Sequence, residues 1–237
     1  MQLRFWHTEK AHEGERGLYL GDAIYGANDG IITTFAVVSG AAGAGFSAGI
    51  IIILGLANLI ADGISMGLSN YLSLRSLGEF HKKQRATEEK EVVESPAEER
   101  GEVRLILKKW GIPDDRLEEI TSAITADKKK WVDLMMKEEL GILENSTSRP
   151  EMHGAVTMIA FVIFGTLPLI PYIFGITQSS QFPVSIISTA ASLFFVGASK
   201  SAATKANWFR SGAEMLLVGG LAASAAYGIG LALKIFL

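Results

Sequence analysis

The stretch GANDGIITTFAVVSGAAGAGFSAGIIIILGLANLIADGISMGLSN, residues 26–70, decides the fold. It holds two long apolar segments separated by a glycine-rich turn at residues 40–45. Its only charged side chains are Asp29 and Asp62, and Met66 lies one helical turn after Asp62. An acid at membrane depth costs about 2.5–3.5 kcal/mol on insertion scales. We therefore expect these acids to have a function, and the pattern favours a path for a metal ion through a membrane.

Composition narrows the class of protein further. The chain has 237 residues, 49% of them hydrophobic, with no cysteine and a net charge of −3. Without cysteine it has no disulfide framework and no thiolate metal site. It carries no P-loop, Rossmann fingerprint or nucleophile elbow, and its four histidines show neither H-x-x-H nor H-E-x-x-H spacing. We expect no enzyme activity, no prosthetic group and no nucleic-acid partner.

Five apolar stretches are long enough to cross a bilayer, which takes about 20 residues. They are expected at residues 22–42, 47–77, 152–174, 182–201 and 213–236. Of the 22 Lys and Arg residues, 21 lie in three groups, which are before residue 22, from Arg75 to Arg149 and from Lys200 to Arg210, and only Lys234 lies elsewhere. The positive-inside rule then predicts a cytoplasmic N-terminus and a C-terminus outside. The polar first 20 residues lack a signal-peptide core.

The segment between the second and third spans is dense in Glu and Lys, and its apolar residues recur at helical spacing. It predicts three helices, at residues 79–94, 96–111 and 114–140. The expected fold class is an all-α membrane protein with five transmembrane helices per subunit and a three-helix cytoplasmic metal-binding insert between helices 2 and 3. The expected domains are an N-terminal arm with helices 1–2 (1–77), the insert (78–150) and helices 3–5 (151–237).

Candidate ligands in the membrane segment follow helical spacing. On the second span an i, i+4 stripe is formed by Asn58, Asp62, Met66 and Asn70. The first span adds Asn28 and Asp29, between two glycines whose backbone could approach an ion. Carboxylate and amide oxygens suit Mn²⁺, and a thioether shifts preference toward softer transition metals. The alternative is that Met66 only packs and the asparagines bond neighbouring helices.

Acidic residues of the insert are also spaced to face one another. Glu88 with Glu91, and Glu99 with Glu102, are i, i+3 pairs, and Glu139 lies four residues after Met135. Closely packed acids repel unless a cation neutralises them, so converging helices would make a metal site. The alternative is a solvated helical face screened by neighbouring basic residues: Lys82, Lys83, Lys90 and Arg100. Spacing alone favours that solvated face.

Four motifs together resemble the vacuolar iron transporter family across nearly the whole chain. They are GANDGIITTFAVVSG (26–40), GLANLIADGISMGLSNYLS (55–73), WVDLMMKEELG (131–141) and GAEMLLVGGLAASAAYGIG (212–230). The resemblance implies a homodimer embedded in membrane lipid, with five membrane helices per subunit and the ion path between the subunits. It implies export of Fe²⁺ from the cytoplasm in exchange for protons, with Mn²⁺, Co²⁺ and Zn²⁺ as further ions.

The resemblance also assigns metal ligands to positions of this chain. In the membrane they are Asp29 and Met66, with Asn28, Asn58 and Asp62 as additional pore-lining candidates. In the insert they are Glu88, Glu91, Glu99, Glu102, Met135, Met136 and Glu139. Many eukaryotic members carry Glu where this chain has Asn58, which puts the second intramembrane carboxylate and proton coupling in question. The A-N-L-I-A-D form resembles the bacterial and archaeal branch and implies a prokaryotic cell membrane.

Three alternatives stay open at this point. A membrane-anchored sensor or buffer would bind metal through the insert and use its helices only as anchors. An intramembrane enzyme would need a nucleophile and base that the chain does not display. A carrier for a different divalent ion would use the same types of ligand, because oxygen and thioether ligands serve several metals.

Overall fold

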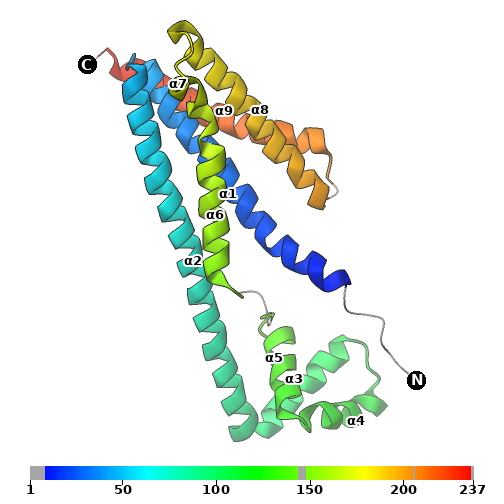
Figure 1. Cartoon of the computed structure of the whole chain (residues 1–237). Helices are drawn as coiled ribbons and strands as arrows, with labels where there is room; N and C mark the ends of the chain where they lie inside the picture. Colours follow the sequence, from blue (N-terminus) through cyan, green and yellow to red (C-terminus); the bar gives the residue numbers. More distant parts are fainter. Residues whose placement is uncertain (1–8, 144–147, 205, 236–237) are drawn as a thin grey trace. The chain divides into compact units, whose positions relative to one another are not determined.

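The computed structural model describes residues 9–143, 148–204 and 206–235, and this part of the chain is all-helical (Figure 1). The helices are α1 (Glu9–Gly43), α2 (Ala48–Glu94), α3 (Pro96–Lys109), α4 (Asp114–Thr125), α5 (Lys128–Glu138), α6 (Pro150–Gly165), the 3₁₀ turn η1 (Leu167–Leu169), α7 (Ile170–Ile173), α8 (Gln178–Thr204) and α9 (Trp208–Leu233). The chain forms two compact units. Unit 1 takes in the described residues of Met1–Tyr71 and Glu151–Leu237, and unit 2 is Leu72–Pro150.

Most helices of unit 1 have the length and composition of membrane spans. Among the described residues, four candidate spans were found: Ala48–Glu94, Pro150–Ile173, Gln178–Ser201 and Trp208–Leu233. Large apolar side chains such as Leu217 and Leu221 stay exposed on these helices, as contact with lipid requires. The chain is a multi-pass integral membrane protein. Helix α1 is not among the four, because Asn28, Asp29 and its threonines lower its hydropathy, so a fifth span stays a prediction.

Helix α2 runs unbroken from Ala48 to Glu94, so the predicted boundary between a span ending at residue 77 and an insert helix beginning at residue 79 is wrong. Gly78 is tolerated inside the helix, because a single glycine costs only about 1 kcal/mol relative to alanine. Unit 2 therefore contains the last part of α2 together with α3, α4 and α5.

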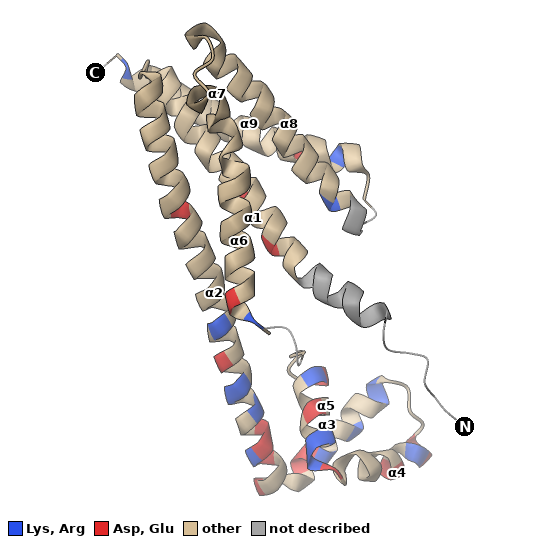
Figure 2. Ribbon diagram, viewed as in Figure 1, with Lys and Arg blue, Asp and Glu red and all other residues tan. Residues whose placement is uncertain are grey.

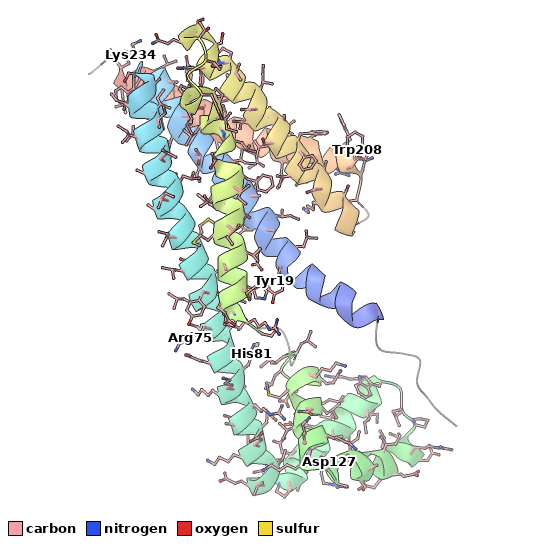
Figure 3. The ribbon with its side chains drawn as sticks, in the orientation of Figure 1. Tyr19, Arg75, His81, Asp127, Trp208 and Lys234 are labelled. Atoms are coloured by element: carbon pink, nitrogen blue, oxygen red, sulfur yellow. The ribbon has the colours of Figure 1, made fainter. Side chains whose placement is uncertain are left out.

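Two other predicted helices are divided. The predicted helix 114–140 is two helices, because the side chain of Asp127 accepts hydrogen bonds from the backbone N–H groups of Lys129 and Lys130 and so starts α5 (labelled in Figure 3). The predicted span 152–174 ends as a regular helix at Gly165, because Pro168 lacks the N–H that the ladder needs. Its remainder continues as η1 and α7.

Glycines let α1 and α6 pack backbone against backbone. A Cβ on Gly26 would collide with the carbonyl oxygen of Thr157, and a Cβ on Gly30 with that of Phe161. Small residues at such contacts are the usual means of close helix approach in membranes. The two glycines that flank Asn28 and Asp29 therefore serve this packing. Helix packing is enough to explain why these positions are glycine, without a backbone contact to an ion.

Unit 2 has its own apolar core. Its buried side chains come from the end of α2 and from α3, α4 and α5: Val92, Val103, Ile106, Leu107, Leu117, Trp131, Val132, Met135 and Met136. Turns with glycine in the left-handed region end α3 and α5, at Gly111 (φ 79°) and Gly141 (φ 67°). The glycines predicted to stop these helices do so, and the helices pack on a single core.

The close contact of α1 with α6 makes a specific prediction for Gly30→Ala. The added methyl group must push the helices apart, which costs about 1–3 kcal/mol for an overpacked contact. We expect a lower melting temperature of the detergent-solubilised protein. Gly228→Ala on α9 is the matched control, since nothing lies within 4 Å of the position that its Cβ would take. Equal melting temperatures for the two variants would contradict the packing described.

Candidate metal path and acidic cluster

Two carboxylates lie near one another inside unit 1. Asp29 on α1 is half-buried and interacts electrostatically with Asp62 on α2. The hydroxyl group of Thr33 donates a hydrogen bond to the backbone carbonyl of Asp29, at 2.8 Å, and not to its carboxylate. The structure thus brings together two acids that the sequence places 33 positions apart. Like charges at short range are unfavourable without a proton or a cation, so the pair is suited to hold one.

The polar residues around this pair contain unsatisfied groups. The side-chain oxygen of Asn28 and the side-chain nitrogen of Asn58 are buried and have no hydrogen-bond partner. Buried polar atoms in native proteins are nearly always paired, so each such atom calls for water, an ion or a transient partner. Met66 is half-buried on α2, one turn from Asp62. These features fit a polar path along α1 and α2 better than they fit interhelical hydrogen bonding.

Asn70, the last member of the predicted stripe, is used differently. Its Nδ2 donates hydrogen bonds to Oδ1 of Asp22, at 2.7 Å, and to Oγ1 of Thr157, at 2.8 Å. Asp22 also contacts His153, whose Nδ1 lies 2.5 Å from Oδ2 of Asp22. No spacing in the sequence marks this group, because its members come from α1, α2 and α6. The one available signal was that Asp22 lies seven residues, two helical turns, before Asp29.

In unit 2 the five predicted glutamates do face one another. Burial and then the charges of Glu102, Glu88, Glu91 and Glu139 raise the pKa of Glu99 from 4.5 to about 7. Partial burial, the charges of Glu102, Glu88 and Glu91, and a hydrogen bond with Glu102 raise the pKa of Glu139 to about 7. Burial, with Glu91 and Glu102, also raises the pKa of Glu88. A solvated helical face would not perturb these acids in this way, so the structure favours the cluster.

The cluster has buried oxygens that lack a partner. Glu88 is 5% exposed and Glu99 is 7% exposed, and one carboxylate oxygen of each has no hydrogen bond. Two basic residues expected to screen the cluster are engaged elsewhere: Lys90 with Glu94 and Arg100 with Glu118. Within the described residues no group of three or more His, Cys, Asp or Glu is already arranged to hold a metal ion. The carboxylates are close enough to repel but are not drawn in to coordination distances.

The two predicted methionine ligands of the insert lie in the apolar core. Met135 is fully buried and Met136 is 6% exposed, both packed among the core residues of unit 2. Met136 also lines a groove with His81 and Arg85. Packing explains both side chains without a metal, so the structure brings together the glutamates and leaves the role of the methionines a prediction.

Comparison with known proteins gives a consistent set of matches. The VIT family profile matches residues 20–231. "Vacuolar iron transporter 2" of Oryza sativa subsp. japonica is 31% identical over 96% of this chain and 92% of its own length. "Vacuolar iron transporter 1" of Arabidopsis thaliana is 32% identical over 93% and 88%, and the "Vacuolar iron transporter" of Plasmodium falciparum is 32% identical over 97% and 89%.

These relatives are plant and apicomplexan proteins, so the similarity gives no support to the expected bacterial or archaeal branch or to a prokaryotic cell membrane. They are named as transporters, and the expectation that the chain is not an enzyme is confirmed. Because the profile covers most of the chain and relatives above 30% identity span nearly all of it, the chain belongs to the VIT family.

Proposed function

We propose that the chain transports Fe²⁺ across its membrane, out of the cytoplasm and in exchange for protons. The observation that carries the proposal is the interaction of Asp29 with Asp62 within the membrane-spanning unit. A helix that served only as an anchor would gain nothing from two acids there. The relatives, all named iron transporters, supply the identity of the ion.

In the proposed path Asp62 supplies the second intramembrane carboxylate, because this chain has Asn58 at the position where many members of the family carry Glu. In the proposed path Fe²⁺ binds between Asp29 and Asp62, with Met66 as a soft ligand one turn away. A thioether favours later transition metals over Mg²⁺ and Ca²⁺, which take oxygen ligands. When Fe²⁺ leaves, positive charge must return to the neighbourhood of the two acids, because like charges at short range repel without a compensating proton or cation. Asn28 and Asn58 complete the lining of this path.

The orientation follows from charge. Lys and Arg are concentrated on the later part of α2, on α3–α5 and near the connection of α8 with α9 (Figure 2). By the positive-inside rule these segments are cytoplasmic. With α1 as a fifth span, the N-terminus is then cytoplasmic and the C-terminus lies outside. The assembly is a homodimer with the path between subunits, a proposal supported by family membership alone.

Unit 2 gathers the ion from the cytoplasm. The acids at Glu88, Glu91, Glu99, Glu102 and Glu139 lie on or beside three different helices, so a divalent cation can neutralise repulsion that the folded unit otherwise carries. Because Glu99 and Glu139 have pKa values near 7, protons and metal compete for this cluster at cytoplasmic pH. Metal binding therefore releases protons.

Ion flux in sealed proteoliposomes tests the transport proposal. Fe²⁺ is supplied under anaerobic conditions to vesicles that contain a chelating dye, with and without a pH gradient, and Mn²⁺, Co²⁺, Zn²⁺ and Mg²⁺ are compared. We expect Fe²⁺ flux that rises with the gradient, and a loss of at least about tenfold for Asp29→Asn, equivalent to ~1.4 kcal/mol. The control is Asp115→Asn, an exposed acid at the start of α4.

The outcomes separate the alternatives. Full flux in Asp29→Asn would remove that carboxylate from the path. Flux that ignores the pH gradient would remove proton exchange while leaving transport. If the native chain moves no ion but still binds Fe²⁺, a membrane-anchored sensor or buffer is the better description.

The acidic cluster makes a separate prediction about pH. The folded-state pKa of Glu99 lies above its usual 4.5, so the folded protein binds extra protons, and metal-free unit 2 loses stability as pH rises through about 7. We expect amide hydrogen exchange in α3 to show less protection at about pH 8 than at about pH 6, after correction for intrinsic rates, and Fe²⁺ to restore it.

Glu99→Gln removes one of the repelling charges. The variant should be more protected than the native chain without metal at high pH, and should gain less from added Fe²⁺. Glu98→Gln is the matched control, because Glu98 is an exposed neighbour in the first turn of α3. Equal Fe²⁺-induced protection in Glu99→Gln and the native chain would contradict a metal-binding role for the cluster.

A further inference from the structure

A buried pair of titratable side chains lies outside the path assigned to Fe²⁺. The side chain of His153 on α6 is 9% exposed, that of Asp22 on α1 is 15% exposed, and His153 Nδ1 lies 2.5 Å from Asp22 Oδ2. We propose that Asp22 and His153 form the proton-binding site of the exchange, distinct from the acids that bind the metal. This inference rests on the proton exchange proposed above, and it assigns the proton to named atoms.

Neighbouring groups hold the pair in a fixed orientation. Asn70 Nδ2 donates to the other carboxylate oxygen of Asp22, at 2.7 Å, and to the hydroxyl of Thr157. That hydroxyl donates in turn to the backbone carbonyl of His153, at 2.9 Å. The ring of Tyr19 packs against the imidazole with centroids 4.7 Å apart (Tyr19 is labelled in Figure 3). Both carboxylate oxygens are therefore engaged, and three helices meet at one titratable pair.

The pair and the metal path lie along one row of polar side chains on α1 and α2, which we call the polar line. Asp22 and Asp29 are seven residues apart on α1, which is two turns on one face and a rise of about 10 Å. On α2, Asn70 and Asp62 are eight residues apart with Met66 midway. The interaction of Asp29 with Asp62 marks one end of the line and the hydrogen bond of Asn70 to Asp22 marks the other. The charged stretch of α2 that begins at Arg75 follows the Asn70 end.

The proton balance is simple. With His153 neutral and its Nδ1–H donated to Asp22, the pair has a charge of −1, and one further proton at Nε2 makes it neutral. A divalent cation about 10 Å away, inside the membrane-spanning unit, repels that added proton and so disfavours its binding. The bound proton weakens binding of the cation by the same repulsion. Fe²⁺ that enters from the cytoplasm thus releases one proton from Nε2 to cytoplasmic water, and departure of Fe²⁺ allows a proton from outside to replace it.

Interhelical hydrogen bonding alone does not account for this arrangement. Asn, Ser and Thr side chains can join membrane helices without a charge, and Asn70 and Thr157 already do so here. A carboxylate and an imidazole add a capacity that amide and hydroxyl groups lack, namely to gain and lose a proton. Among the residues whose side chains the structure describes, other titratable groups near the pair include Tyr19 on α1, Tyr71 on α2, which packs against Gly154, and the exposed Glu151 on α6.

The test measures Fe²⁺ and proton flux together in proteoliposomes of the full chain, with a chelating dye for Fe²⁺ and a pH dye for protons. We expect His153→Gln to retain Fe²⁺ flux down its gradient, with the protons moved per Fe²⁺ reduced at least about fivefold, the low end of typical coupling factors. Asp22→Asn, which keeps an oxygen acceptor at the same place, should act alike and serves if His153→Gln does not fold. His81→Gln, a half-buried histidine of unit 2, is the control and should keep native coupling.

Each outcome decides between the proposals. A folded His153→Gln or Asp22→Asn with native coupling overturns the assignment of the proton site. A folded variant that loses Fe²⁺ flux altogether also overturns it, since the pair would then belong to the metal path. Absence of proton movement in the native chain overturns proton exchange itself, and with it this site. Loss of coupling in both variants, with Asp29→Asn blocking Fe²⁺ flux, separates the two roles as proposed.

Discussion

A carboxylate that is removed from water must find a proton, a hydrogen-bond donor or a cation, and the arrangement of this chain depends on how its acids meet that requirement. Asp22 has two partners, His153 and Asn70. Glu99 and Glu139 are compensated by protons, because burial and neighbouring acids hold their pKa values near 7. Asp29 has a second acid, Asp62, as its electrostatic neighbour. The acids that lack a positive partner are the ones proposed to bind the transported cation.

The position of Asp29 depends in turn on packing. Gly26 and Gly30 bring the backbone of α1 against α6 at Thr157 and Phe161, on either side of the acid. A carboxylate on a helix held this closely cannot move far to meet an ion, so the path is fixed by a rigid element. The same contact brings α1 beside the part of α6 that carries His153. Small residues in α1 therefore serve the chemistry indirectly, by setting where the acids of α1 lie relative to α6.

Much of this could be predicted from the sequence, and the failures have physical causes. The i, i+3 spacing of Glu88 with Glu91, and of Glu99 with Glu102, predicted that each pair shares a helix face, because local helical geometry decides it. Spacing alone favoured a solvated face and did not predict that these helices converge. The break at Asp127 was missed because apolar periodicity continues across it, although an Asp followed by lysines is a recognisable helix start. Met135 and Met136 match the family motif, yet their burial in the core of unit 2 depends on packing that no motif describes.

The Asp22–His153 pair could not be predicted, since its members are 131 positions apart and neither has a motif around it. This long-range contact matters because it separates two tasks that a single carboxylate performs poorly. An acid that must bind both Fe²⁺ and the returning proton can release one only when the other arrives at the same atoms. If the proton binds at His153 instead, the two ions interact through charge over about 10 Å and need not occupy one site in turn. Exchange then requires only that both sites cannot be filled together, a condition that electrostatic repulsion along a shared polar line supplies.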